Sequence, residues 1–217
     1  MKNLLIKEFR LATLPLTYLF LLFSLMTFIP GYPILCGAFF VCLGIFQSYQ
    51  RNREDNDILY SVLLPVSKKE VVVAKYIAVV LLQMTAFAIC AVCTVVRMTF
   101  LSDVRVYTTN ALMGANLVFL AFVLLIFAAF NMIFVGGFFK TAYGIGKPFV
   151  TFIVVNFLII GFAETLHHIP GFGWLNVLDF SCFGEHFLIL VIAVIVYVAS
   201  TVVSCRVSQR RFEKIDL

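Results

Sequence analysis

The residues best suited to chemistry gather in one stretch of the chain, residues 164–186. All three histidines fall there, together with three carboxylates. Imidazole and carboxylate groups are common zinc ligands, so one interpretation of this stretch is a surface metal site, and with it an enzyme. The spacing matches no recognised zinc motif, which leaves other interpretations of the stretch open. The set consists of Glu164, His167, His168, Asp179, Glu185 and His186.

Other reactive groups give weaker signals. Cys90 and Cys93 have the spacing of a thiol–disulfide redox motif, but they lie inside an apolar run without a strand–helix–strand pattern around them. The chain has no G-x-x-x-x-G-K-[ST], G-x-S-x-G or H-E-x-x-H motif for a nucleotide, a serine nucleophile or a catalytic zinc. The main prediction is therefore a protein that is not an enzyme and that holds no cofactor of its own.

Residues 51–76 form the long charged segment between two apolar blocks, and their order suits a mechanical task. Asp57 is a good helix N-cap, because its carboxylate can accept hydrogen bonds from the free N–H groups of the first turn. Pro65 ends the apolar run that follows, since the residue before a proline is pushed out of the helical region. The sequence therefore predicts a short helix over residues 57–64.

A second helix start follows at once. Ser67 and Glu70 have the capping-box spacing directly before the next apolar run. A short helix is thus expected to lie across the start of a long one. If the long helix spans a membrane, the short one lies on the membrane face, where a soluble partner can bind it.

The elements that position these groups are membrane helices. Hydrophobic residues make up 63% of the chain and charged residues 12%, against about 45–50% and about 25% in soluble domains. Several apolar runs approach or exceed the ~20 residues that cross a bilayer core. We therefore expect an all-α integral membrane protein in which residues 1–217 form a single transmembrane domain in contact with the lipid bilayer.

Polar and turn segments divide the chain into six predicted spans. Residues 1–10 carry three cations and suit a segment in the membrane interface. Residues 164–186, with Trp174, suit an external helical cap at headgroup level, the competing interpretation of the histidine-rich stretch. The predicted spans are residues 11–29, 34–50, 68–96, 111–139, 148–163 and 187–205, with a loop at 51–67, a basic turn at 140–147 and a basic tail at 206–217.

Orientation follows from the positive charges of the loops. Of the 16 lysines and arginines, all but Arg97 and Arg105 fall on the side that holds both termini and residues 51–67. Cytoplasmic loops carry this excess, so both termini and the loop are expected in the cytoplasm. The net charge of +5 is explained by the same rule, and we expect no nucleic-acid partner.

The apolar cores of the six spans contain no aspartate, glutamate, lysine, arginine or histidine, where the cores are residues 11–29, 34–46, 76–96, 113–139, 148–163 and 187–205. This weakens the case for an ion-driven carrier, because such carriers place charged or titratable groups inside the membrane. The polar amides that remain have two interpretations, which are hydrogen bonding between helices and the lining of a substrate path. These amides are Gln83, Asn116, Asn131 and Asn156.

The charged loop resembles that of the permease subunits of ATP-binding-cassette (ABC) exporters. The similar strings are Glu54-x-Asn56-x-x-Leu59-Tyr60, Leu64-Pro65-Val66-Ser67-Lys68-Lys69 and Lys75-Tyr76. They are similar to the small bacterial branch that includes multidrug, bacteriocin-type and phenol-soluble-modulin peptide exporters. In that family an LPVSRK-like string follows a coupling helix that docks on a separate ATPase subunit.

The resemblance implies an ATP-driven exporter in a bacterial cell membrane. Two permease copies, identical or not, would work with two ATPase subunits, which bind the ATP and Mg²⁺. The cargo would be hydrophobic or amphipathic, with a peptide as the preferred candidate. The residues implied in ATPase coupling are Glu54, Asp57, Ile58, Leu59, Tyr60, Ser61, Leu64, Pro65, Ser67, Lys68 and Glu70.

Two alternatives from other classes stay open at this point. A membrane enzyme or accessory subunit would use the histidine-rich stretch, and it would hold a metal and act without ATP. A channel or secondary carrier would need no ATPase partner. Only the exporter requires the loop at residues 51–76 to be covered by another protein.

Overall fold

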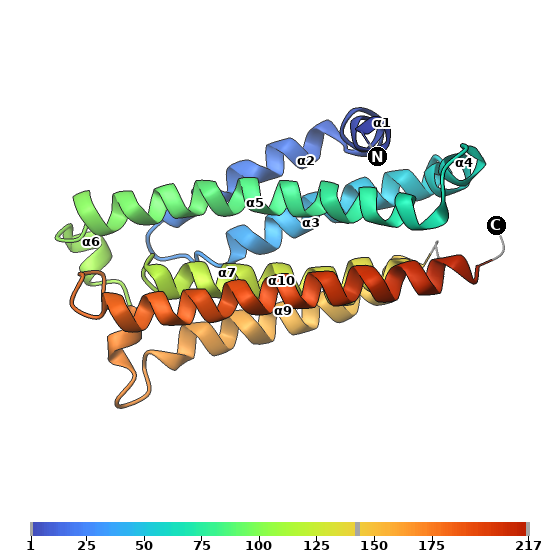
Figure 1. The fold of residues 1–217 in the computed structure, drawn as a ribbon. Helices are drawn as coiled ribbons and strands as arrows, with labels where there is room; N and C mark the ends of the chain where they lie inside the picture. Colours follow the sequence, from blue (N-terminus) through green and yellow to red (C-terminus); the bar gives the residue numbers. More distant parts are fainter. Residues whose placement is uncertain (1, 142–143, 216–217) are drawn as a thin grey trace.

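The computed structural model describes residues 2–141 and 144–215, and these fold into helices joined by turns, without strands (Figure 1). The all-helical membrane class predicted from composition is confirmed. In chain order the helices are α1 (Lys2–Lys7), the π-helix η1 (Glu8–Ala12), α2 (Pro15–Phe20), the 3₁₀-helix η2 (Leu21–Phe28), α3 (Cys36–Glu54), α4 (Asp57–Leu63), α5 (Lys68–Phe100), α6 (Arg105–Thr108), α7 (Leu117–Ala129), the π-helix η3 (Phe130–Val135), α8 (Gly136–Phe138), α9 (Gly146–Leu166), the 3₁₀-helix η4 (Gly173–Asn176) and α10 (Phe183–Glu213).

The long helices run back and forth along one direction (Figure 1). Helices α1 and α4 and the last turns of α10 lie at one end of the molecule, called here the α4 end. Helix α6 and the turn that contains η4 lie at the opposite end, the α6 end. Helix α5 connects the two, beginning at the α4 end and finishing at the α6 end.

Four helical stretches in the described part of the chain are long and apolar enough to cross a membrane. They are Lys68–Phe100, Leu117–Phe138, Gly146–Leu166 and Phe183–Glu213. A fifth crossing is formed if the bent pair Lys2–Ala12 and Pro15–Phe28 counts as one span. Helix α3, the predicted second span, is not among them, because its last turns are polar and charged. The structure therefore supports four to five of the six predicted spans.

The N-terminal segment contains a sharp bend between η1 and α2. The stretch Lys2–Ala12 makes an angle of 86° with Pro15–Phe28. Thr13 and Leu14 between them are extended, as expected of residues that precede Pro15. The Leu14 N–H donates to Ser48 Oγ at 2.9 Å, which fastens the bend to α3.

Two predicted boundaries need correction. The fourth predicted span begins as helix α7 at Leu117 rather than at residue 111. Asn116 Oδ1 accepts from the backbone N–H groups of Val118 and Phe119 and so caps the helix there. Residues 164–186 were expected to be a helical segment, but only the turn η4 is helical between the ends of α9 and α10. Pro170 and Gly171, the latter with a φ of +92°, account for the break.

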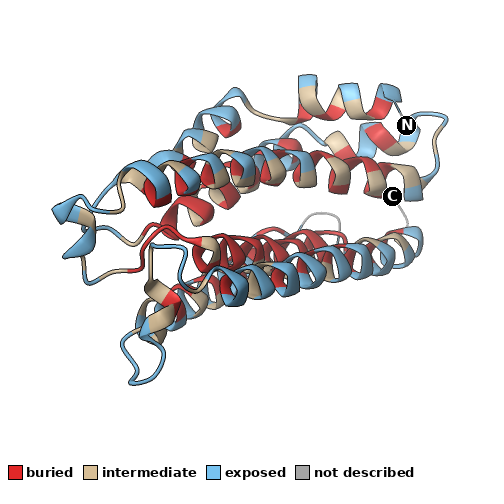
Figure 2. Cartoon of the chain, turned by 60° about the vertical axis from the view of Figure 1, so that its left-hand side comes forward, coloured by how far each residue is buried: buried red, intermediate tan, exposed pale blue. Residues whose placement is uncertain are grey.

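Helices that are similarly apolar in sequence differ in how much of their surface is buried. In the span Leu117–Phe138 78% of the most apolar window is buried, against 22% in Phe183–Glu213. Buried residues face the interior between the layers of helices, and the outer faces of α9 and α10 are exposed (Figure 2). The α7–α8 run is therefore the core of the bundle, and α10 offers most of its surface to its surroundings.

Candidate functional site

The candidate site lies at the α4 end, where α4 meets α5 and the N-terminal helices. Helix α4 starts after Asn56, which adopts the left-handed conformation with a φ of +53° and makes no side-chain cap. The prediction that Asp57 caps this helix is wrong. Asp57 is instead the first helical residue, and its carboxylate turns to two lysines.

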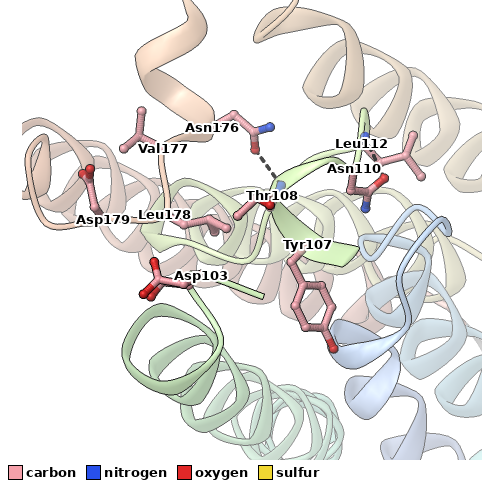
Figure 3. A pocket seen from close by; sticks show the side chains of 11 residues that line it. Asp103, Tyr107, Thr108, Asn110, Leu112, Asn176, Val177, Leu178 and Asp179 are labelled. Atoms are coloured by element: carbon pink, nitrogen blue, oxygen red, sulfur yellow. Dashed lines mark hydrogen bonds between the residues drawn. The ribbon is translucent and has the colours of Figure 1, made fainter. Parts of the chain in front are cut away.

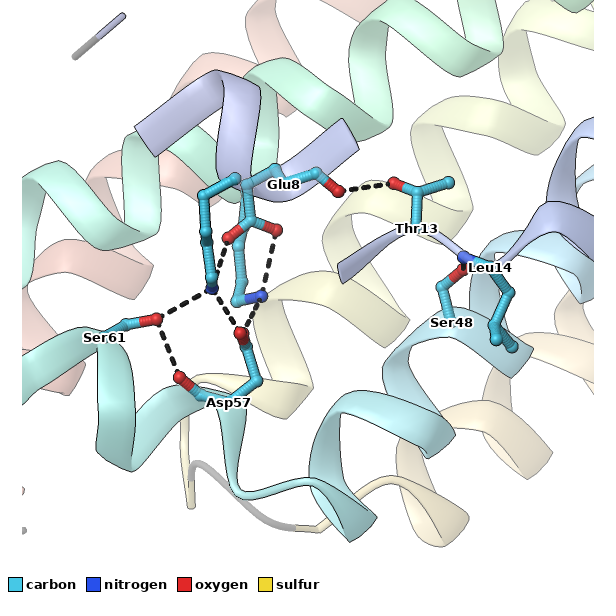
Figure 4. A network of polar contacts seen from close by, with 8 residues as sticks. Glu8, Thr13, Leu14, Ser48, Asp57 and Ser61 are labelled. Carbon is cyan, nitrogen blue, oxygen red and sulfur yellow. Dashed lines mark hydrogen bonds and ion pairs between the residues drawn. The ribbon is translucent and has the colours of Figure 1, made fainter. Parts of the chain in front are cut away.

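Four side chains from three parts of the chain form what we call the charge cluster: Lys7, Glu8, Asp57 and Lys75 (Figure 4). Lys75 Nζ lies 3.0 Å from Glu8 Oε2 and 2.8 Å from Asp57 Oδ2. Lys7 Nζ lies 3.0 Å from Glu8 Oε1 and also pairs with the Asp57 carboxylate. Each cation thus contacts both anions, and the cluster is neutral as a whole.

The cluster is largely removed from solvent. The side chain of Lys75 is 2% exposed and that of Glu8 6%. Burial by itself favours the protonated form of Asp57, but the charges of Lys75 and Lys7 outweigh this and hold its pKa below the ordinary 3.8. Buried charges persist only where their partners are in place, so the cluster fixes the relative positions of α1, α4 and α5.

A hydroxyl extends the cluster along α4. Lys7 Nζ donates to Ser61 Oγ at 2.8 Å, and this hydroxyl donates to the Asp57 carbonyl at 2.7 Å. Ser61 is 1% exposed and Ile58 2%. These two residues, three apart on the helix, form the inner face of α4.

The opposite face of α4 is apolar and exposed. Tyr60 is 67% exposed and Leu63 74%, with Leu59 beside them, and Leu64 directly after the helix is 48% exposed. Large apolar side chains in this position, on a short helix at the end of the bundle, form a surface that suits a protein partner. Glu54 lies nearby at the end of α3 and is also exposed.

The predicted capping box at the start of α5 is confirmed. The Glu70 N–H donates to Ser67 Oγ at 3.3 Å, and the Ser67 N–H donates to Glu70 Oε2 at 3.0 Å. Leu64 ahead of Pro65 is extended, so α4 ends at Leu63, one residue before the predicted end at residue 64.

The start of α5 also holds the end of α10. Lys68 Nζ donates to the Ile215 carbonyl at 2.7 Å, and Lys69 Nζ lies 3.0 Å from Glu213 Oε1. Deeper in the bundle, the Tyr76 hydroxyl lies 2.8 Å from Ser204 Oγ. Helices α5 and α10 are therefore joined at the α4 end.

The amides proposed from sequence lie apart from the charge cluster, and all four are buried. Gln83 on α5 and Asn131 on η3 exchange two hydrogen bonds of 3.0 Å, and Tyr197 and Thr201 on α10 join them. The predicted bonding between helices is confirmed for this pair.

The other two amides behave differently. Asn116 caps α7 and donates to the carbonyl of Leu175, whereas both side-chain atoms of Asn156 are buried without a hydrogen-bond partner in the described structure. Five surface cavities in the described part of the molecule are lined by other residues than these four amides.

The histidine-rich stretch does not come together as a metal site. No group of three or more histidine, cysteine, aspartate or glutamate side chains in residues 2–141 and 144–215 is placed to hold a metal ion. His167 Nε2 lies 3.1 Å from the Ala111 carbonyl and His186 Nε2 2.9 Å from that of Trp174. Glu164 accepts from the Met113 N–H. These side chains hold the turns of the α6 end.

Sequence reasoning missed three of the four residues of the charge cluster as members of a site. Lys7 and Glu8 were assigned to an interfacial segment, and Lys75 was treated as a charge near the start of a span. One signal in the sequence could have indicated the cluster. Two lysines and two carboxylates lie next to apolar runs, and charges at the edge of a buried region need partners of opposite sign. Which of these charges pair depends on the 86° bend, which the sequence does not reveal.

Comparison with known proteins agrees with this geometry. The family model described as ABC-2 family transporter protein matches residues 3–213, nearly the whole chain. No curated protein and no solved structure matches the chain. The helical bundle, the apolar spans and the family model lead to one conclusion: the chain belongs to the ABC-2 family of transporter proteins.

Proposed function

We propose that this chain, as the membrane-spanning subunit of an ABC transporter, is driven through α4 by a separate ATPase subunit. One observation carries the proposal, which is the two-sided character of α4. Its outer face exposes Leu63 and Tyr60, whereas its inner face is fixed to α5 by the charge cluster. A helix of this kind can bind a partner and pass the partner's movement to a span.

The mechanism follows from the joints around α4. When the ATPase subunits close on ATP, they displace α4. The bond between Asp57 and Lys75 and the capping box at Ser67 transmit this displacement to α5. The contacts of Lys68 and Lys69 pass it on to the end of α10. Helices α5 and α10 then tilt together, which opens a path outward for cargo.

The assembly and its location extend the same proposal. Two permease copies stand side by side in a bacterial plasma membrane, each with one ATPase that binds ATP and Mg²⁺. The excess of lysine and arginine supports a cytoplasmic α4 end with both termini there. The cargo is hydrophobic or amphipathic, and a peptide is the preferred candidate.

The experiment is native mass spectrometry of the complex after gentle extraction, with the host's ATPase subunits left available for capture. The wild-type chain is expected as two permeases with two ATPases. Leu63→Asp should abolish ATPase capture, because a charge in a buried apolar contact is strongly unfavourable. The matched control is Val106→Asp, which alters a residue 55% exposed at the α6 end.

Three outcomes would contradict the proposal. The first is capture of the ATPase by Leu63→Asp at the wild-type level. The second is equal loss of capture in Val106→Asp. The third is transport by the permease alone in sealed vesicles without ATP, as a channel or carrier would show.

A further inference from the structure

Arg97, at the α6 end of α5, is a buried cation without a carboxylate. The residue is 2% exposed, and none of the ion pairs among the described residues involves it. Lys75, on the same helix, is buried to the same extent but pairs with two carboxylates. A buried charge costs several kcal/mol unless it is compensated, so Arg97 calls for an explanation that Lys75 does not.

The guanidinium is only partly satisfied by the protein. Its Nη1 donates to the Thr27 carbonyl at 2.8 Å, and its Cζ lies 4.2 Å from the centre of the Tyr107 ring. Its Nε is buried and has no hydrogen-bond partner in the described structure. One strong donor therefore remains free, beside a positive charge that no anion balances.

Two buried hydroxyl groups also lack a hydrogen-bond partner. Ser24 Oγ on η2 and Thr94 Oγ1 on α5 are also buried without a partner in the described residues. Thr94 lies one turn before Arg97 on the same face of α5. Ser24 lies three residues before Thr27 on a 3₁₀-helix, where such residues are eclipsed. Across the two helices, the Cys90 thiol donates to the Ser24 carbonyl and Arg97 donates to that of Thr27, so the three free donors lie along the contact between η2 and α5.

Tyr107 separates this set from a cavity of about 300 Å³ at the α6 end. Asp103 and Asp179 line the cavity, and the Tyr107 ring extends away from them toward η2 (Figure 3). The Tyr107 hydroxyl donates to the Phe28 carbonyl at 3.0 Å, which holds the ring in place. An anion that approached through the cavity would meet two carboxylates, so the membrane side, between η2 and α5, is the favourable route.

We propose that Arg97, with Ser24 and Thr94, forms a binding site for the anionic head of an amphiphile, a phosphate or carboxylate group. Such a group supplies a negative charge and several acceptor oxygens, which match a guanidinium and two hydroxyls. Access requires only a local separation of η2 from α5 on the membrane side, and it does not depend on the ATP-driven tilt of α5. The occupant is either a membrane lipid or exported cargo, and both present the same chemistry here. The site goes beyond the coupling mechanism and is tested without ATP or an ATPase.

The test uses the full chain labelled with ¹⁵N-arginine, in nanodiscs of zwitterionic phosphatidylcholine, with dodecyl phosphate as the probe. NMR follows the Nε–H signals. One signal is expected to shift saturably, and Arg97→Gln should remove both the signal and the binding. The control Arg105→Gln alters an exposed arginine of the same end and should leave both unchanged. Dodecyltrimethylammonium should have no effect.

Two further arms identify the occupant. Replacement of phosphatidylcholine by phosphatidylglycerol shifts the Arg97 signal without a probe if the head is that of a lipid. An amphipathic peptide with a free carboxylate shifts it, and its amidated twin does not, if the head is that of cargo. The double variant Ser24→Ala, Thr94→Ala keeps the charge and should bind dodecyl phosphate roughly tenfold more weakly.

Three results would overturn the proposal. The first is that dodecyl phosphate at saturating concentration leaves every arginine signal of the folded wild-type chain unshifted. The second is that the double variant binds it as tightly as the wild type. The third is a high-resolution structure, determined with the probe present, that shows only water on Arg97 Nε and the two hydroxyls. Each of these means that the donors serve packing or hydration alone.

Discussion

Lys75 shows how one residue links the parts of the proposed coupling apparatus. Its ammonium group lies between Glu8 of the N-terminal helices and Asp57 of α4, while its own backbone belongs to α5. The sequence shows these charges but not their pairing, because they are separated by up to 67 positions along the chain. The capping box, by contrast, is local and was predicted residue by residue. At this scale sequence predicts contacts within a turn and misses those between helices.

Removal of Lys75 should destabilise the protein strongly. Lys75→Met is expected to cost about 3–5 kcal/mol in the free energy of unfolding, because it leaves two carboxylates with one cation. Unfolding in mixed detergent micelles measures this, with the exposed Lys2→Met as the control. A cost below that of the control would mean that the cluster does not hold the helices together.

The cluster should also make stability depend on pH. The pKa of Asp57 in the folded protein is below its ordinary 3.8 because Lys75 and Lys7 outweigh the effect of burial. Its contribution to stability is therefore complete above the ordinary pKa and is lost as the pH falls through the lowered pKa. We expect Tm to drop below a pH of about 4, with a smaller drop in Asp57→Asn. Equal drops in both proteins would exclude Asp57 as the cause.

At the scale of the element, α4 and the start of α5 act as one joint. The capping box predicted the start of α5 correctly and Pro65 the end of α4 to within one residue, since these signals act within a turn. The limits of the long helices were less accurate, because α5, α9 and α10 continue beyond their apolar runs into polar ends. Apolarity marks the part of a helix that meets lipid, whereas backbone hydrogen bonds decide where it stops.

Loosening the joint should uncouple ATP hydrolysis from transport. Ser67→Ala is expected to cost about 0.5–2 kcal/mol of cap stability, and Pro65→Gly adds freedom to the backbone beside it. The ATPase rate of the complex with cargo, divided by the transport rate, should rise in both variants. Thr108→Ala, an exposed change at the α6 end, is the control. Unchanged ratios in both variants would show that a rigid joint is not needed.

At the scale of the whole molecule, composition was enough to predict the class, and the family match agrees with it. The arrangement of the helices was not accessible in the same way. The α7–α8 run and α10 are similarly apolar in sequence, yet one is the buried core and the other an outer helix. Periodicity cannot distinguish them, because lipid-facing and buried faces are both apolar in a membrane. Arg97, which lies just outside the predicted span 68–96, is in fact buried in α5, because the helix continues to Phe100.

The most direct test of the coupling mechanism is whether α4 and α5 move as one body. Spin labels at the exposed positions Asp55, in the turn that leads into α4, and Phe100, at the far end of α5, report their distance by pulsed electron resonance in the permease–ATPase complex. A second experiment measures the distance between the Asp55 positions of the two copies. On trapping with ATP and vanadate, we predict that the distance between copies shortens while the distance from α4 to the end of α5 stays the same. A change in the distance from α4 to α5, with the distance between copies unaltered, would contradict the account.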